Sequence, residues 1–406
     1  MWDKISKISL AAVIFLAAGS NIALAKNSEP ESTGIQAGNF VIHPGVDASV
    51  AYHMRDNEAH TEHNDGLVDV GAHLRTHLLD ETMHKWDNSL EFVWRQYWGL
   101  GDARTSGAPD VRVSTEADLF RQNTFRIAPS ASYYYVGDPE DENLRREATN
   151  HHIRGGLDFY IQPGAGAIFS QKFGYQVAGK IYTGGNDNDY FSHRISSLTR
   201  WNFMPHTSMA LDIDFRINHF LEDSHEKSLP IRVKYDLTGL LLARLSYELG
   251  LGYAYDGYAY DETDKLLGSM FIVKARLRYD FTEDVGLFVE YKRDFDISVL
   301  QGVSYYKYNR VKLGFNALWF KHLQTDLAFG YGAFGFIADS EDDGRKDFVG
   351  SYGRSDNLLS AEANIFYHII PGFKIGLEYR LRYNLSNAAN AEYNRNLFMF
   401  SLAYEY

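Results

Sequence analysis

Basic side chains recur at every second position in several stretches of the chain, with apolar residues between them. In 271–281, Lys274, Arg276 and Arg278 alternate with apolar residues. A Lys or Arg on the lipid face of a barrel costs about 2–4 kcal/mol at the membrane midplane, so we predict that such side chains point inward. The charged residues that we expect to line a barrel interior are Arg216, Arg232, Lys234, Arg244, Lys274, Arg276, Arg278, Lys292, Arg310, Lys312, Lys374, Arg380, Arg382, Glu248, Glu290 and Glu378.

This basic wall has two interpretations, and the sequence leaves both open. Lys and Arg can neutralise Asp and Glu on adjacent strands and stiffen the barrel. Alternatively, the wall is a selectivity surface, because rings of basic side chains favour anionic solutes. The whole chain carries a formal net charge of −13, so we expect its acidity in the long loops. That charge argues against nucleic-acid binding.

Residues suited to metal or hydrolytic chemistry are present without a matching pattern. Ser192 and His193 are adjacent and therefore point to opposite faces, while Ser360 and His368 lie far apart on one face. The segment 339–344 has a calcium-like composition but lacks the twelve-residue loop with its closing Glu. Six histidines cluster without forming a short ligand motif: His53, His60, His63, His73, His77 and His84. We predict no catalytic, cofactor-binding or metal site, no cofactor and no enzymatic activity.

The elements that must position these side chains are period-two strands. The last ten residues, 397–406, alternate large apolar residues with small and polar ones. Such a strand at the end of the chain is typical of an outer-membrane barrel, where the last strand closes on the first and leaves no edge. We expect it also to be read by the barrel-assembly machinery. Its outward residues are Phe398, Phe400, Leu402, Tyr404 and Tyr406.

The beginning of the chain resembles a secretory signal. Lys4 and Lys7 precede an apolar run over 8–18, and Ala23 and Ala25 mark a small-residue cleavage site. The run is shorter than the roughly 20 residues that a membrane helix needs. The absence of cysteine excludes disulfides and thiolate metal sites. We therefore predict a signal peptide over 1–25, a short periplasmic leader over 26–38 and a barrel over 39–406, placed in the bacterial outer membrane.

The remaining chain fits an all-β, up-and-down antiparallel transmembrane β-barrel. Aromatic residues make up 15% of the chain, with 28 Tyr and 26 Phe. The ambiguous segment 113–137 is assigned two strands with a turn over 127–130. Short turns are predicted at 204–206, 237–239, 282–284 and 370–372, and longer acidic loops between them. In outer-membrane barrels the short turns lie on the periplasmic side and the long loops on the extracellular side. The predicted turns and loops alternate in this way only if the chain has 18 strands. A barrel of 16 strands is the alternative.

Two stretches of the sequence carry a resemblance to a known family. One is Phe40-Val41-Ile42-His43-Pro44-Gly45-Val46, leading to Tyr52. The other is Tyr379-Arg380-Leu381-Arg382-Tyr383-Asn384-Leu385-Ser386-Asn387, followed by Tyr393-Asn394-Arg395-Asn396. Both resemble an outer-membrane β-barrel porin family of myxobacterial type that accompanies exopolysaccharide export gene clusters. The resemblance implies an 18-stranded barrel acting as the terminal exit for a secreted polysaccharide, together with a periplasmic export protein.

The expected function is therefore passage through the outer membrane. The leading hypothesis is a translocation pore for exopolysaccharide; the alternative is a porin for small anionic or sugar solutes, and a second alternative is an outer-membrane hydrolase. Expected partners are outer-membrane lipid, lipopolysaccharide, the barrel-assembly machinery, a periplasmic export protein and the polysaccharide. Inward aromatic residues that could stack on sugar rings are Tyr160, Tyr182, Phe288 and Phe366.

Overall fold

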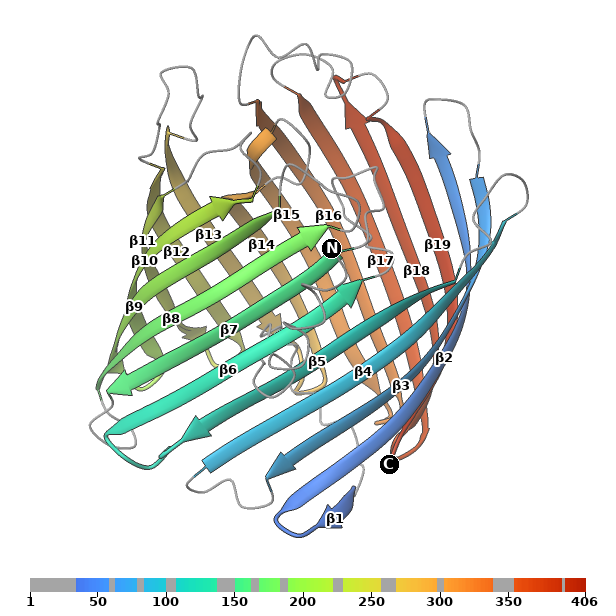
Figure 1. Ribbon diagram of the computed structural model, residues 1–406, viewed down its shortest axis with the longest axis horizontal. Helices are drawn as coiled ribbons and strands as arrows, with labels where there is room; N and C mark the ends of the chain where they lie inside the picture. Colours follow the sequence, from blue (N-terminus) through green and yellow to red (C-terminus); the bar gives the residue numbers. More distant parts are fainter. Residues whose placement is uncertain are drawn as a thin grey trace.

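The protein forms a single antiparallel sheet that closes on itself into a barrel (Figure 1). The computed structural model describes residues 34–57, 63–78, 84–99, 107–136, 150–161, 168–182, 189–221, 229–256, 268–297, 303–338, 354–388 and 391–406. No helix in these ranges is long and apolar enough to cross a membrane. The predicted signal peptide, most of the leader and the long acidic loops lie outside the described residues.

Eighteen strands, β2 to β19, make up the barrel, and β1 is an extra strand. In chain order they are β1 (Ile35–Ala37), β2 (Phe40–Asn57), β3 (His63–Leu78), β4 (His84–Gly99), β5 (Gly107–Leu119), β6 (Phe125–Val136), β7 (Asn150–Ile161), β8 (Phe169–Tyr182), β9 (Tyr190–Met204), β10 (Thr207–Phe220), β11 (Pro230–Leu242), β12 (Leu245–Asp256), β13 (Gly268–Asp280), β14 (Val285–Ile297), β15 (Val303–Trp319), β16 (Leu323–Ala338), β17 (Ser355–Ile370), β18 (Phe373–Ser386) and β19 (Tyr393–Glu405).

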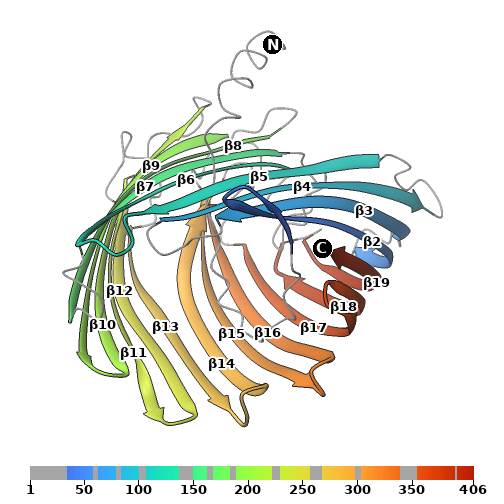
Figure 2. The same cartoon turned by 90° about the horizontal axis from the view of Figure 1, so that it is seen from below.

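The barrel closes where β19 pairs with β2. The ladder runs from the Tyr393–Asn57 pair to the Glu405–Gly45 pair, and the Tyr406 amide donates to the Pro44 carbonyl at 2.9 Å. Seen from below, the strands form a continuous ring (Figure 2). The prediction of 18 strands with closure by the C-terminal strand is confirmed. β1 pairs with the first residues of β2.

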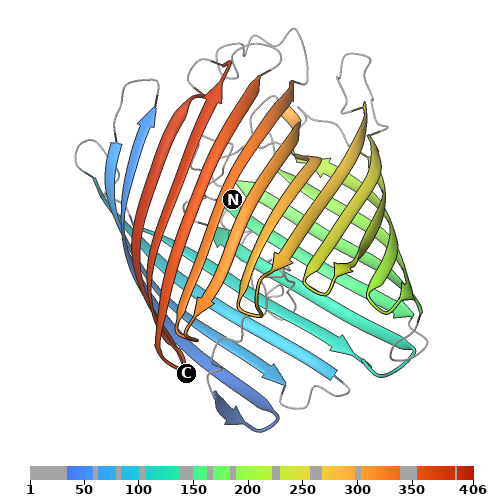
Figure 3. The same ribbon diagram turned by 180° about the vertical axis from the view of Figure 1, so that it is seen from behind.

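The outer face of the barrel is apolar. Large hydrophobic side chains at alternate positions are exposed there, including Leu251 (65%), Phe271 (69%) and Leu277 (46%). Exposed apolar residues lie on β10 to β19, the strands that face the viewer in Figure 3, and also on the strands of the opposite wall. Such a belt would be costly in water, whereas it suits a hydrocarbon surround, in which a closed barrel satisfies all its backbone hydrogen bonds.

One predicted turn is wrong, at 237–239. The chain instead turns at Ala243–Arg244, and β11 continues through Gly239 to Leu242. Gly239 serves a close approach rather than a turn, because a Cβ there would lie 2.9 Å from the Tyr247 hydroxyl and 3.0 Å from the His206 carbonyl oxygen. Glycine at this position therefore indicates that neighbouring groups approach the strand backbone closely, not that the chain turns.

The predicted turn at 127–130 is also wrong, although this segment does hold two strands. The chain turns at 120–124, where Phe120 adopts a left-handed φ of 60°, a conformation that sequence reasoning does not expect of Phe. Pro129 lies inside β6, opposite a gap in the β5–β6 ladder between the Glu116–Ser130 and Leu119–Ile127 pairs. A proline is tolerated there because no partner on β5 requires its missing N–H.

The predicted turns at 204–206, 282–284 and 370–372 are confirmed within a residue. The last of these depends on Gly372, whose φ is +81°. A Cβ at that position would lie 2.0 Å from the Glu405 carbonyl oxygen. Glycine therefore allows β17 and β18 to turn tightly beside the end of the closing strand.

Candidate functional site: the inner wall of the barrel

The inner wall carries the charged side chains, opposite the exposed apolar belt. All but one of the interior residues predicted from the sequence lie on the half-buried face of a strand. Arg216 is on β10, Arg232 and Lys234 on β11, Glu248 on β12, Lys274, Arg276 and Arg278 on β13, Glu290 and Lys292 on β14, Arg310 and Lys312 on β15, and Lys374, Glu378, Arg380 and Arg382 on β18.

Arg244 is the exception. It lies in the turn between β11 and β12, is exposed, and donates from Nη1 to the Phe281 carbonyl oxygen at 2.5 Å. Its placement on a strand face followed from the wrong turn at 237–239, so the prediction that it lines the interior is corrected. Its contact ties two short turns together.

Three cations lie side by side across β13, β14 and β15. The Cα partner of Lys274 is Lys292, and that of Lys292 is Arg310. Like charges directly opposite each other in a sheet are destabilising. The positions flanking this basic row in register, Gly250 and Gly332, have no side chain. The register places a second row of three cations, Arg382, Arg395 and Arg55, across β18, β19 and β2.

Carboxylates partly offset the basic row. Lys274 Nζ lies 2.6 Å from Glu248 Oε1, and Lys292 Nζ lies 3.5 Å from Asp294 Oδ2. Asp294 is shared, because Arg232 Nη1 lies 3.6 Å from its other oxygen. Glu248 and Asp294 thus pair with Lys274, Lys292 and Arg232 in this corner of the barrel.

Elsewhere the wall carries ion pairs within and between strands, so cations and carboxylates neutralise one another as the first of the two interpretations expects. The pairs include Arg276–Glu290 at 3.7 Å, Lys312–Glu362 at 4.0 Å, Arg380–Glu378 at 3.2 Å and Lys234–Asp236 at 2.9 Å. These side chains are half-buried. The inner wall therefore contains ion pairs, which the first interpretation expects, and a basic row, which the second expects.

The inward aromatic residues lie beneath cations. The Arg276 guanidinium is 4.5 Å from the centre of the Phe288 ring, and Lys374 Nζ is 5.4 Å from that of Phe366. The Tyr160 ring has Arg126 at 4.7 Å and a lysine at 5.3 Å. Cation–π contact accounts for these rings without a sugar ligand. The Tyr182 side chain lies outside the described residues.

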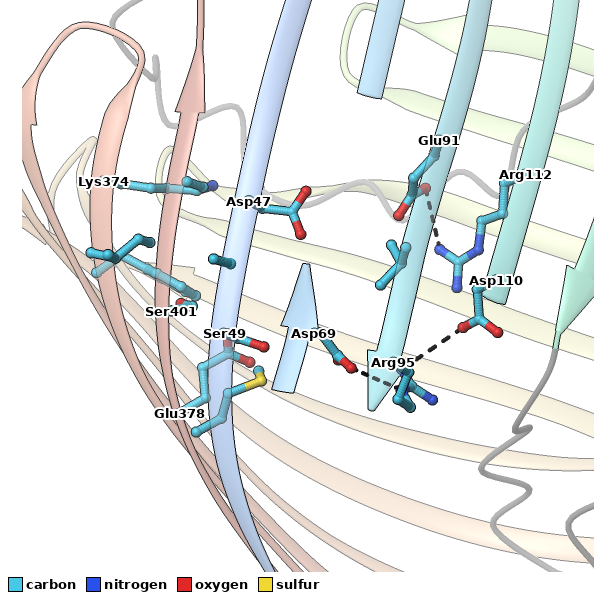
Figure 4. Close-up of a pocket in the computed structure, with 16 residues that line it drawn as sticks. Asp47, Ser49, Asp69, Glu91, Arg95, Asp110, Arg112, Lys374, Glu378 and Ser401 are labelled. Carbon is cyan, nitrogen blue, oxygen red and sulfur yellow. Dashed lines mark hydrogen bonds and ion pairs between the residues drawn. The ribbon is translucent and has the colours of Figure 1, made fainter. Parts of the chain in front are cut away.

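A cavity of 330 Å³ opens on the inner wall between β2–β5 and β18–β19 (Figure 4). It was not predicted, because its residues come from both ends of the chain and meet only when the barrel closes. Arg95 lies between Asp69 (Nε–Oδ1 3.1 Å) and Asp110 (Nη2–Oδ2 3.8 Å), and Arg112 lies 3.6 Å from Glu91. Its other labelled residues are Asp47, Ser49, Lys374, Glu378 and Ser401. Acidic side chains predominate here, in contrast to the basic row.

The described residues contain no group of three His, Asp or Glu side chains placed to hold a metal ion. His73 instead contacts Glu405 (Nε2–Oε2 3.1 Å), and His77 stacks on His43 with ring centres 5.0 Å apart. His60 and the side chains of His53 and His63 lie outside the described residues. Ser192 is buried, while His193 contacts the outward Tyr175 hydroxyl at 2.9 Å. The structure thus gives this Ser–His pair no shared face.

No protein-family model and no curated protein matches the chain. Solved structures do match its fold. The outer membrane protein OpdK from Pseudomonas aeruginosa is 10% identical, with a TM-score of 0.51 over 90% of this chain and 99% of that chain. OccK2 (OpdF) from Pseudomonas aeruginosa, in complex with glucuronate, is 10% identical with a TM-score of 0.51 over 90% of this chain and 98% of that chain.

At this level of identity the likeness shows the fold. Together with the apolar belt and the closed ring of 18 strands, it makes the protein a bacterial outer-membrane β-barrel. The expected association with exopolysaccharide export gains no support from these matches.

Proposed function

We propose that the protein is a diffusion channel for small anionic solutes, with sugar acids as the favoured class. The basic row of Lys274, Lys292 and Arg310 carries this proposal, because it concentrates positive charge on one wall. Rings and rows of basic side chains lower the barrier for anions entering a pore. Barrels of 16–18 strands are wide enough to leave an aqueous passage.

The matched OccK2 structure holds glucuronate, a small sugar acid, within the same fold. This favours the alternative stated from the sequence over a pore for a polymer. Polymer export rested on short motif resemblances alone. The acidic cavity between β2–β5 and β18–β19 gives the interior a second, oppositely charged wall, so a solute in transit experiences a transverse field.

Ion selectivity tests the proposal. Wild-type channels in planar bilayers under a KCl gradient are expected to show a reversal potential of the sign that indicates anion preference. Replacing Lys274, Lys292 and Arg310 by Glu is expected to move it toward cation preference, because the row then attracts K⁺. The matched control is Lys321→Glu, a charge reversal in an exposed turn, which is expected to leave the potential nearly unchanged.

Solute flux provides a second readout in the same preparation. Liposomes containing the wild-type barrel are expected to swell faster in glucuronate than in glucose, whose ring is of similar size but neutral. The triple variant is expected to lose this difference. If the triple variant folds and keeps the wild-type reversal potential and glucuronate preference, the basic row does not determine selectivity and the proposal is wrong.

A further inference from the structure

Two cations point outward from the barrel at the long-loop end of neighbouring strands. Arg293 on β14 is exposed and stands between Lys292 and Asp294, which pair with each other on the inner wall. Lys307 on β15 stands between two tyrosines that pack against the inner cluster around Phe334. Because side chains alternate along a strand, Arg293 and Lys307 both face the membrane.

The two cations are close enough to act on one ligand. Arg293 has Asn309 as its Cα partner, and Lys307 lies two residues before Asn309 on the same strand. Diagonal neighbours of this kind lie about 7–8 Å apart, within reach of long side chains. Asn309 adds a third polar group: its Oδ1 accepts from the Tyr291 hydroxyl at 3.0 Å, so its amide hydrogens remain available as donors on the same surface.

No protein group neutralises these charges in the part of the chain that the structure describes. No carboxylate whose side chain the structure describes lies within 4.0 Å of Arg293 or Lys307. Below them the outer face is apolar, with Val289, Val311 and Leu313 between 43% and 45% exposed. A Lys or Arg costs about 2–4 kcal/mol at the midplane of the membrane but about 0–1 kcal/mol at its interface. The pair therefore belongs at the membrane boundary, beside an anion.

The neighbouring hairpin continues the polar strip. Tyr291, Val311 and Tyr331 are successive Cα partners across β14, β15 and β16, so the two tyrosines lie in one row. Tyr331 donates its hydroxyl to Asn357 Oδ1 at 2.7 Å, as Tyr291 does to Asn309. Two hydrogen-bonded tyrosines thus lie on the outer face on either side of Val311, at the upper edge of the apolar surface.

We infer that Arg293, Lys307 and Asn309 form an outward-facing site for a phosphate of the lipopolysaccharide anchor. The site lies at the end of β14 and β15 that is joined by 298–302, opposite the short turns at 281–284 and 320–322. Short turns are periplasmic and the other end extracellular, so the adjacent lipid is that of the outer leaflet. Its anionic groups there are phosphates on a sugar, and two cations with an amide donor complement them.

Stabilisation of the folded barrel by lipid tests this site, independently of any transport activity. The purified protein in neutral detergent is titrated with bis-phosphorylated lipid A, and with the same lipid after its phosphates are removed. The readout is the temperature at which the folded band is lost in heat-modifiable gel mobility, supported by the lipid bound in native mass spectrometry. The wild type is expected to gain stability from the phosphorylated lipid only.

Variants locate the effect. Arg293→Ala with Lys307→Ala is expected to weaken the response to phosphorylated lipid A at least tenfold, whereas Lys321→Ala, in a turn at the opposite end, is expected to respond as the wild type does. Arg293→Lys with Lys307→Arg keeps both charges and is expected to bind. An unchanged response of the double alanine variant would overturn the site. If that variant fails to fold, an equal response of the wild type to both lipids would overturn it.

Discussion

At the scale of single residues, Arg354 and Asp356 form the most deeply buried ion pair among those that the structure describes. Arg354 is 8% and Asp356 is 2% exposed, and Arg354 Nε donates to Asp356 Oδ1 at 2.9 Å. Asp356 also accepts from the Ser386 hydroxyl at 2.6 Å and from Asn384 Nδ2 at 3.3 Å. The Arg354 guanidinium stacks 4.5 Å above the Phe336 ring. Arg354 Nη2 also donates to Oδ2, so all four acceptor sites of this carboxylate are occupied, as a buried charge requires.

Asp356→Ala is expected to destabilise the barrel by about 3–5 kcal/mol, because it leaves a buried guanidinium without its counter-charge. Urea unfolding in detergent, followed by tryptophan fluorescence, measures this difference. The control is Asp280→Ala, which breaks the Arg278 pair at 2.7 Å where the Asp280 side chain is 39% exposed. That loss is expected to be about 1 kcal/mol or less. Equal losses for the two variants would contradict the argument from burial.

At the scale of elements, the strand faces could be predicted from the sequence, but the partners across strands could not. Period-two alternation alone places Lys274 inward and Leu277 outward, since a charge on the lipid face is costly. The Lys312–Glu362 pair needs β15, β16 and β17 in register, which no local pattern specifies. The turns predicted at Gly239 and beside Pro129 were wrong because both residues lie inside a strand. Gly239 allows other groups to approach the backbone closely, and Pro129 lies at a gap in the hydrogen-bond ladder.

The closing strand gives a prediction about assembly. Phe398→Ser with Phe400→Ser removes two large side chains from the lipid face of β19, 47% and 42% exposed to the surround. Each Phe transferred from water to an apolar phase contributes about 1.5–3 kcal/mol, and closure depends on this strand. Folded barrel in outer-membrane fractions, measured by heat-modifiable gel mobility, is expected to fall severely.

The control changes the opposite face of the same strand. Ser401 and Ala403 point inward from β19, between the outward aromatic residues. Ser401→Ala with Ala403→Ser alters two positions without removing apolar area from the lipid face, so assembly is expected to be normal. Wild-type amounts of folded barrel in the Phe398/Phe400 variant would refute the requirement for an apolar closing face.

At the scale of the whole molecule, the proposed function depends on the closed ring, the apolar belt and the charged interior together. The ring removes unpaired strand edges from the hydrocarbon. The belt holds the barrel in the outer membrane, and the proposed phosphate site on β14 and β15 would fix its depth at the outer leaflet. The interior has a basic row on β13 to β15 and an acidic cavity between β2–β5 and β18–β19. Such a field discriminates among small solutes by charge.

Deleting the gene separates passage of small solutes from export of a polymer. A channel for small anions predicts normal surface polysaccharide in the deletion strain, together with slower uptake of sugar acids such as glucuronate and unchanged uptake of neutral sugars of the same size. The reason is that the basic row acts on solute charge, while a long polymer would need binding along the whole passage. Surface carbohydrate staining and radiolabelled glucuronate uptake, compared with the complemented strain, measure both effects. Loss of surface polysaccharide with accumulation of polymer inside the envelope would reverse the conclusion and reinstate export.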